Sequence, residues 1–262
     1  RALRKPAMIN SWDSKIGRKD YQEYLTENAD LGNYSDILKG DMTFGETYSS
    51  YRVRTSSLLQ DYREYLRQIN ELQESEFREE KLSVGKEYHQ YDGKKYKHII
   101  YANGHVASKS KFWNYLPFNL SKGEALKVEG LDKPFDKILK YLLFVVPLTD
   151  GNFWIGSSNN WDFTDNKPEK QARNYLETRL SEFISPELKT IDHLAGIRPT
   201  VDDRRPLIGT HPKYSTIHLF NGMGTKGVSL SPYLAHQMKN HLIKSSEFDD
   251  SVNISRFESN YR

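Results

Sequence analysis

The sequence has 262 residues, of which 37% are hydrophobic and 28% are charged, a balance typical of a globular protein with a sizeable core. Its 38 basic and 35 acidic side chains leave a net charge of only +3, which gives no electrostatic reason to expect a nucleic-acid partner. The absence of cysteine excludes disulfides, thiolate metal sites and a cysteine-linked cofactor. No run approaches the roughly 18 apolar residues that a membrane span requires.

The first part of the chain predicts helices and a hairpin. A short helix is expected around residues 21–25. Apolar residues then recur at helical spacing, which predicts a helix over 56–70 with a hydroxyl side chain from 55–57 as its N-cap. Residues 78–101 alternate in strand fashion and turn at Asp92-Gly93, a dipeptide typical of tight hairpins.

The middle of the chain is rich in β-forming residues. The run KHIIYANGH, at residues 97–105, predicts an apolar strand that ends in a turn. Further strands are expected over 122–130, 141–148 and 152–158. Asp150-Gly151 predicts a hairpin between the last two of them.

Two more helices are expected, on either side of one strand. The first helix has Asp165 or Asn166 as its predicted N-cap and stops at Pro186. Residues 216–221 then predict a strand, and residues 228–243 predict the second helix, with apolar side chains along one stripe.

The order of these elements bears on the fold class. Strands and helices alternate irregularly, which argues against a simple doubly wound sheet and favours an α+β arrangement with a large antiparallel sheet. The tail from Ser245 is polar and is expected to be peripheral. No H-E-x-x-H, P-loop or G-x-S-x-G motif is present, and the histidines do not cluster at ligand spacing, so no metal site is expected.

The most specific part of the sequence is residues 195–232, which hold a literal G-x-G-x-x-G at Gly222, Gly224 and Gly227. Backbone N–H groups at the start of a helix bind anionic groups, so the loop is a candidate cofactor site. No strand with an acidic ribose ligand follows, as an independent dinucleotide site would require. The alternative is that these glycines only let a helix pack tightly on a strand.

Two runs, GIRPTVDDRRPLIG and IHLFNGMGTKGVSLSP, resemble the C-terminal part of the FAD-dependent amine and amino-acid oxidoreductases. This is the superfamily of D-amino-acid oxidase, glycine oxidase and sarcosine oxidase. YRVRTSSLLQDYREYL, HIIYANGHVAS and VVPLTDGNFWIGSSNNWDF are similar to earlier segments of the family, so the resemblance covers most of residues 48–243. The family's N-terminal strand–GxGxxG–helix unit has no match here, so we expect a truncated enzyme that lacks at least one βαβ unit of roughly 30 residues.

The resemblance implies an incomplete FAD-binding domain of α/β type, interleaved with an antiparallel-sheet substrate domain. It assigns residues 48–109 and 190–262 to FAD binding, and residues 1–47 and 110–189 to the substrate domain. The implied cofactor is FAD, bound non-covalently. The chain would bind FAD poorly or not at all without the N-terminal unit.

The resemblance also places the glycine loop against the flavin ring. It implies a cofactor-binding set that consists of Asn103, Gly104, Gly222, Met223, Gly224, Thr225, Lys226 and Gly227. Lys226 would act catalytically by stabilising the negative charge of the reduced flavin, where the alternative is a solvated loop lysine.

The substrate side of the implied site depends on one arginine. Arg198 would bind the substrate carboxylate through two parallel hydrogen bonds and so orient the reacting carbon, where the alternative is a structural salt bridge to Asp202 or Asp203. Arg204 and Arg205 are expected to pair with those two aspartates. Aromatic walls would complete the substrate site: Tyr141, Phe144 and Trp154.

The implied activity is oxidation of the C–N bond of a small amine or amino acid by hydride transfer to flavin. One alternative is a non-catalytic binding protein that keeps the fold and has lost the flavin. Another is an oxidase that acts on an amine of a larger molecule, such as a modified RNA, which the balanced charge disfavours. We expect no nucleic-acid partner, no membrane span and a cytoplasmic location.

Overall fold

The computed structural model describes residues 2–4, 25–27, 36–39, 43–47, 51–131 and 137–261. The chain separates into two compact units, each made of two segments that are distant in sequence. Unit 1 comprises Arg1–Tyr51 and Lys122–Ile197, and unit 2 comprises Arg52–Ser121 and Arg198–Arg262. The roles that the sequence assigns to two interleaved domains stay predictions.

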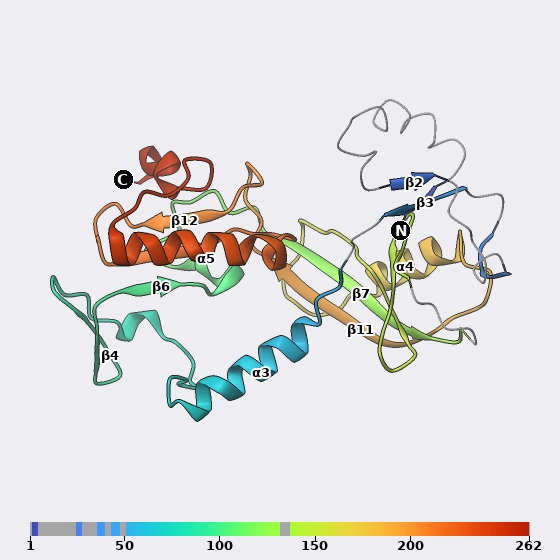
Figure 1. Ribbon diagram of the computed structural model, residues 1–262, viewed down its shortest axis with the longest axis horizontal. Coiled ribbons are helices and arrows are strands. Elements are labelled where there is room, and N and C mark those ends of the chain that lie inside the picture. The colour runs from blue at the N-terminus through green and yellow to red at the C-terminus, as the bar shows by residue number, and fades with distance from the viewer. Residues whose placement is uncertain are drawn as a thin grey trace. The chain divides into compact units, whose positions relative to one another are not determined.

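Unit 1 is built on a five-stranded sheet with the strand order β11-β7-β10-β9-β8. Figure 1 shows its two long strands, β7 and β11, side by side. Its strands are β7 (Ser121–Glu129), β8 (Leu139–Lys140), β9 (Phe144–Pro147), β10 (Phe153–Gly156) and β11 (Lys189–Arg198). β10 is antiparallel to both β7 and β9, and β9 is antiparallel to β8. The hairpin predicted at Asp150-Gly151 is therefore confirmed, because this turn joins β9 to β10.

A second, three-stranded antiparallel sheet belongs to unit 1 and has the order β1-β3-β2. Its strands are β1 (Ala2–Arg4), β2 (Leu25–Glu27) and β3 (Thr43–Thr47). Leu25 thus begins a strand, where the sequence predicts a short helix. Tyr21 and Tyr24, which contributed to that prediction, lie outside the described residues.

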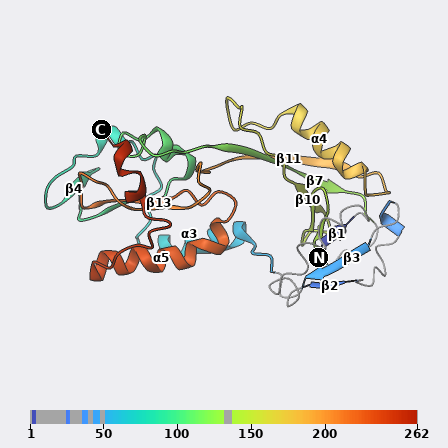
Figure 2. The ribbon, with the colours of Figure 1, turned by 90° about the horizontal axis from the view of Figure 1, so that it is seen from above.

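Helix α4 (Lys170–Ser181) packs on one face of the five-stranded sheet, as Figure 2 shows. Leu176 and Leu180 of the helix join Leu126 and Ile155 of the sheet in one buried core. The predicted helix is confirmed, but its N-cap is wrong. The N-cap residue is Glu169, whereas the Asp165 carboxylate accepts a hydrogen bond of 2.9 Å from the backbone of Lys167 in a local turn before the helix.

Unit 2 contains a three-stranded sheet with the order β12-β13-β6. Its strands are β6 (Ile99–Tyr101), β12 (Leu207–Thr210) and β13 (Ile217–Asn221). β13 is antiparallel to β12 and parallel to β6. Helix α5 (Gly227–Lys244) packs on the Ile208 side through Leu234 and Met238, while the other side carries a core that includes Tyr101 and Trp113. The strand and helix predicted around the glycine loop are confirmed.

The remaining elements of unit 2 include one helix and one hairpin that the sequence predicts correctly. They are α3 (Thr55–Gln68), η2 (Glu79–Lys81), β4 (His89–Tyr91), β5 (Lys94–Tyr96) and η3 (Gly104–Lys109). Asp92-Gly93 joins β4 to β5 as a two-residue turn. Residues 55–57 lie inside α3 rather than capping it, because the N-cap residue is Arg54. No residue of α3 is buried against the part of the chain that the structure describes.

The polar tail is not peripheral, contrary to the sequence-based expectation. It includes the short helix η4 (Ile254–Asn260), and Phe248, Val252 and Ile254 are buried. The backbone N–H of Ile208 donates a hydrogen bond of 3.0 Å to the carbonyl of Val252. β12 lies at the edge of its sheet, so its backbone groups need partners, and the tail supplies them. Among the described helices, none is long and apolar enough to cross a membrane.

A chain of hydrogen-bonded histidines crosses unit 2. His98 Nδ1 lies 3.0 Å from His218 Nε2, and the hydroxyl of Thr210 lies 2.9 Å from both His218 Nδ1 and His241 Nε2. His241 Nδ1 lies 2.9 Å from the carbonyl oxygen of Ser246, which can only accept, so Nδ1 carries the proton. The other donors follow step by step from this one. The Thr210 hydroxyl donates to His241 Nε2, His218 Nδ1 donates to the Thr210 hydroxyl, and His98 Nδ1 donates to His218 Nε2. The chain is therefore complete with three neutral rings.

Acid should destabilise unit 2 through His218 of this chain and through His211, which lies outside the chain. Burial, followed by the charges of neighbouring histidines, lowers the pKa of His218 to about 4, and burial together with Lys213 lowers that of His211 to about 4. The folded state thus binds fewer protons than the unfolded state between about pH 4 and pH 6.5, so stability is present above this window and is lost as the pH falls through it. We expect a loss of about 2 kcal/mol per ring between pH 7.5 and pH 4.5.

Urea denaturation of the purified protein at both pH values measures this loss. His218→Gln should remove about half of the pH dependence, because His211 still contributes its share. His236→Gln, at an exposed position, should leave the pH dependence unchanged. If His218→Gln kept the full pH dependence of the wild type, the assignment to the histidine chain would be wrong.

Candidate functional site

The loop between β13 and α5 depends on two glycines for its conformation. Gly222 and Gly224 have φ values of 74° and 52°, a left-handed region that side chains disfavour. A Cβ atom at Gly222 would lie 2.7 Å from the backbone nitrogen of Leu207, and one at Gly224 would lie 3.0 Å from Thr200 Cγ2. Both glycines are therefore required where the loop packs on its neighbours within unit 2.

The third glycine, Gly227, has a different environment at the start of α5. A Cβ atom there would meet only Met223 Cβ, at 4.0 Å, so the backbone faces open space. Lys226 is the N-cap residue, and among the described residues no side chain caps the helix. The backbone N–H of Lys226 donates to the carbonyl of Met223 over 2.9 Å, which fixes the loop. The helix start therefore offers uncapped N–H groups, the positive end of the helix dipole and an exposed lysine.

The turn that carries Arg198 is held against this loop. The Thr200 N–H donates to the Arg198 carbonyl over 2.9 Å, and the Asn119 N–H donates to the Thr200 carbonyl over 2.8 Å. The Thr200 hydroxyl donates in turn to the Asn119 carbonyl. The Gly224 N–H then donates to the Pro199 carbonyl over 3.3 Å. The structure thus brings the Arg198 turn and the glycine loop together.

Arg198 itself is partly buried, and burial lowers the pKa of its guanidinium from the ordinary value. The group nevertheless keeps its charge at neutral pH, because arginine starts from a very high pKa. A partly desolvated guanidinium attracts anions more strongly than one in free solvent.

The two aspartates that follow Arg198 have partners other than those predicted. Asp203 pairs with Arg256 at 2.9 Å, and Asp202 accepts a hydrogen bond of 2.8 Å from an asparagine amide. Within the described residues, neither Arg204 nor Arg205 forms an ion pair with them, so that prediction is wrong. The tail brings Arg256 to this position, a contact between distant residues that no local pattern in the sequence indicates.

Asn221, which the sequence-based predictions do not include, links two turns of the candidate site. Its side-chain amide donates to the carbonyl of Gly104 over 2.8 Å, and its side-chain oxygen accepts from the N–H of Gly222 over 2.9 Å. β6 and β13 are parallel, so the turn at Asn103-Gly104 and the glycine loop leave the same edge of the sheet. The buried Asn221 ties these two turns together. The available signal was a polar residue at the end of an apolar strand, next to a glycine.

The predicted aromatic walls lie in unit 1 and occupy two different faces of its sheet. In the register, Lys140, Phe144, Gly156 and Ala125 lie opposite one another in a row across four strands. The next row contains Leu139, Val145, Ile155 and Leu126, all buried under α4. Side chains alternate between faces, so the first row points away from α4. We call this surface the Phe144 face.

Trp154 shares the Phe144 face, and Tyr141 does not. A Cβ atom at Gly156 would lie 2.7 Å from Trp154 Cη2, so the indole ring covers that glycine. Tyr141 is buried and packs edge-on against Phe183, with ring centroids 5.5 Å apart. Its position in the tight connection between β8 and β9 turns it into the core. Whether Phe144 and Trp154 share a site with Arg198 stays a prediction, because they belong to different units.

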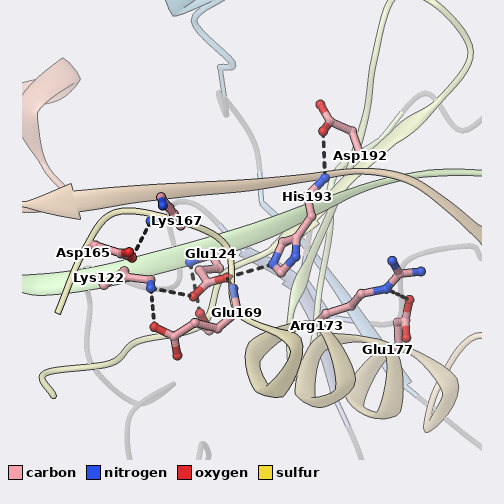
Figure 3. Close-up of polar contacts among 10 residues, drawn as sticks. Lys122, Glu124, Asp165, Lys167, Glu169, Arg173, Glu177, Asp192 and His193 are labelled. Carbon is pink, nitrogen blue, oxygen red and sulfur yellow. Dashed lines mark hydrogen bonds and ion pairs between the residues drawn. The ribbon is translucent and has the colours of Figure 1, made fainter. Parts of the chain in front are cut away.

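Unit 1 also contains a buried cluster of charges on the α4 face (Figure 3). Lys122 contacts Glu169 and lies 3.5 Å from Glu124. Glu124 accepts a hydrogen bond of 2.8 Å from the Glu169 backbone and lies 2.8 Å from His193 Nε2. That last contact is close but not aligned, since His193 Nε2 has no hydrogen-bond partner among the described residues.

This cluster has a structural role. Burial lowers the pKa of Lys122, but its contacts with Glu169 and Glu124 outweigh burial and leave the pKa raised. The charges pair with one another and attach the start of α4 to β7. Charged residues at alternate positions of an apolar strand, as at 122 and 124, are the signal that could have revealed it. Among the described residues, no group of histidines and carboxylates is arranged to hold a metal ion.

Replacing Asn221 should destabilise the paired turns. Asn221→Ala leaves the Gly104 carbonyl and the Gly222 N–H without their partner, at a cost of about 2 kcal/mol in the free energy of unfolding. Asn114→Ala, at an exposed position, should change it by less than about 0.5 kcal/mol. Urea denaturation measures both variants, and equal small effects would remove Asn221 from this role.

The chain matches a family of known proteins. The pattern of the FAD dependent oxidoreductase (DAO) family matches residues 46–240. The glycine oxidase of Pseudomonas aeruginosa is 30% identical over 92 residues, which are 34% of this chain and 25% of that protein. The matched segment thus spans a quarter of the length of this relative.

Solved structures show the same fold at low sequence identity. Iminodiacetate oxidase from Chelativorans sp. BNC1 superposes with a TM-score of 0.73 at 17% identity, covering 98% of this chain and 74% of the other. L-proline dehydrogenase from P. horikoshii gives 0.76 at 11% identity, covering 98% and 76%. Glycine oxidase from Geobacillus kaustophilus gives 0.66 at 16% identity, covering 98% and 73%. With the family pattern matched over most of its length, the chain belongs to the FAD dependent oxidoreductase family.

Proposed function

We propose that the 222–227 loop binds the flavin of FAD and that the protein oxidises the C–N bond of a small amine or amino acid. The observation that carries this proposal is the hydrogen bond from Gly224 to Pro199. It holds the turn of a partly buried arginine against an uncapped helix start. A carboxylate-binding group and a flavin-binding group would then lie in adjacent turns.

The residues of the loop fit a flavin. The pyrimidine edge of the flavin ring carries carbonyl oxygens, which accept hydrogen bonds. The start of α5 offers N–H donors without a side-chain cap among the described residues, and Gly227 leaves its backbone open to a close approach. Lys226 adds a positive charge at the same point, and no acidic residue lies in the first turn of the helix. Met223 and Thr225 complete the loop, and Asn103 and Gly104 are proposed to contact the adenosine side.

The mechanism assigns separate tasks to the protein groups. The chemistry that the flavin supplies when bound is acceptance of a hydride equivalent from the carbon next to the substrate nitrogen. The helix start and Lys226 would stabilise negative charge that develops at the ring edge. Arg198 would hold the substrate carboxylate with two parallel hydrogen bonds, on a turn that Pro199 and Thr200 keep rigid.

The Phe144 face would supply the apolar wall of the substrate site. Phe144 is 44% exposed, and Trp154 is partly exposed on the same face. Such rings exclude water from a reacting centre and leave room for apolar parts of a substrate. We do not assign this role to Tyr141, which is buried in the core.

The flavin assignment predicts a coloured protein. The full-length protein should bind FAD, show flavin absorbance, and lose that absorbance when a substrate amino acid is added without oxygen. Gly227→Val should weaken FAD binding about ten-fold or more, because the new side chain occupies the open space beside the helix start. Ala235→Val, at an exposed position of the same helix, should bind FAD like the wild type. A colourless protein that ignores added FAD would favour the non-catalytic binding protein instead.

If Arg198 binds the substrate carboxylate, its removal should reduce activity mainly on substrates that have a carboxylate. Arg198→Ala should lower kcat/KM for an amino acid. The loss should correspond to about 2–4 kcal/mol of transition-state stabilisation, the scale of a charge-paired hydrogen bond. The matching amine has no carboxylate and should be oxidised much more slowly. Arg198→Ala should affect that oxidation far less. Anaerobic flavin reduction with alanine and with ethylamine separates the two effects. Equal losses for both compounds would mean that Arg198 supports the fold rather than the substrate.

A further inference from the structure

A groove beside the start of α4 has the size and the lining of a ligand site. Its volume is about 730 Å³, within the range of about 300–1,000 Å³ that small-molecule sites occupy. One wall is the loop that follows β10, at residues 157–162, and the other is formed by α4 and the residue before it. Two aromatic rings line the groove, Trp161 from the loop and Tyr175 from the helix. Every lining residue belongs to unit 1.

Both walls of the groove are fixed on strand β7. The N–H groups of Lys122 and Asn160 each donate to the carbonyl of the other residue, over 2.7 Å and 2.8 Å. The Ser158 N–H donates to the Glu124 carbonyl over 2.9 Å, so the loop follows the edge of the strand. The helix wall is attached to the same strand, because Lys122 and Glu124 both contact Glu169 (Figure 3). The groove is therefore formed before any ligand binds.

The two rings offer their surfaces to a ligand. Trp161 is 62% exposed and Tyr175 is 46% exposed. Among the described residues, the Trp161 ring has no stacked ring and no cation as a partner. The guanidinium carbon of Arg179 lies 5.5 Å from the centroid of the Tyr175 ring, and Arg179 is already paired with Glu182 at 2.9 Å. Faces of tryptophan and tyrosine rings attract cations, and tryptophan attracts them most strongly.

The polar lining of the groove is negatively charged. Asp162 and Glu169 supply two carboxylates, and no lysine, arginine or histidine lines the groove. Glu169 contacts the buried Lys122, whereas the Asp162 carboxylate has no ion pair and no hydrogen bond among the described residues. The start of α4 alone would favour an anion, but the Glu124 carboxylate already accepts a hydrogen bond of 2.8 Å from the Glu169 N–H there. Aromatic faces together with an unpaired carboxylate favour an organic cation.

We infer that this groove binds a methylated ammonium ion. Its methyl groups contact the rings of Trp161 and Tyr175, and its positive charge is attracted by Asp162 and Glu169. Methyl groups spread the charge over a surface that an aromatic ring can contact. A neutral ligand of the same shape would lose the attraction to the rings and to the carboxylates. The inference does not rest on the proposed function, because none of these residues has a role in it.

The test compares two compounds that differ in charge and hardly in shape. Choline carries a trimethylammonium group, and 3,3-dimethylbutan-1-ol carries a neutral tert-butyl group in its place. Calorimetric titration of the full-length protein measures the Kd of each compound. We expect choline to bind more tightly by about ten-fold or more, because only choline gains the cation–π contacts and the charge attraction. Equal binding of the two compounds, or no binding of choline, overturns the inference.

Substitutions then locate the binding site. Trp161→Leu should weaken choline binding about ten-fold, and Trp161→Phe should restore it in part, because phenylalanine is a weaker cation–π partner. Asp162→Asn should weaken the binding of choline and leave that of the alcohol unchanged. Glu187→Gln is the matched control, since it removes the same charge from an exposed position of unit 1 outside the groove, and it should bind choline like the wild type.

The variants also separate this groove from any other place where choline binds. Choline binding that survives both Trp161→Leu and Asp162→Asn lies elsewhere and overturns the inference. Thermal unfolding of each variant checks that unit 1 remains folded, as expected for substitutions at exposed positions. A protein that binds choline in this groove but ignores FAD would support this inference and contradict the proposed function, so the two can fail separately.

Discussion

The conformation of the 222–227 loop depends on contacts that only glycine permits. Gly222 packs against the backbone of Leu207, and Gly224 against Thr200, at distances that leave no room for a side chain. Both have positive φ, so the backbone turns sharply from β13 into α5. This turn exposes the start of the helix and directs the Gly224 N–H to the Pro199 carbonyl. That bond holds the Arg198 turn to the loop, together with the hydrogen bonds that Thr200 forms with Arg198 and Asn119.

Buried and partly buried polar groups in this protein differ in the partners that they find within the chain. Asn221, the three linked histidines and the Lys122 cluster find their main partners within the chain, so they hold turns and elements in place. Lys140 finds an aromatic ring and one carbonyl, but no carboxylate among the described residues.

Much of the secondary structure could be predicted, because local patterns determine it. The hairpins at Asp92-Gly93 and Asp150-Gly151 and the helix after the glycine loop follow from turn residues and apolar spacing, and all are confirmed. The predicted N-cap of α4 was wrong because the Asp165 side chain accepts a hydrogen bond within a local turn instead of capping the helix. The burial of the tail was not predicted, because its few apolar residues become buried only when the tail forms hydrogen bonds with the open edge of β12.

The sequence by itself determined the family, because the runs around Arg198 and the glycine loop are specific and continuous in the chain. Only the tertiary structure decided which face each residue joins. A one-residue alternation along a strand separates Phe144 from its neighbours in the core, and a tight connection buries Tyr141. The same register sets Lys140 beside Phe144 and pairs Asn221 with Gly104 across parallel strands. Such pairings join residues distant in the chain, and no local pattern encodes them.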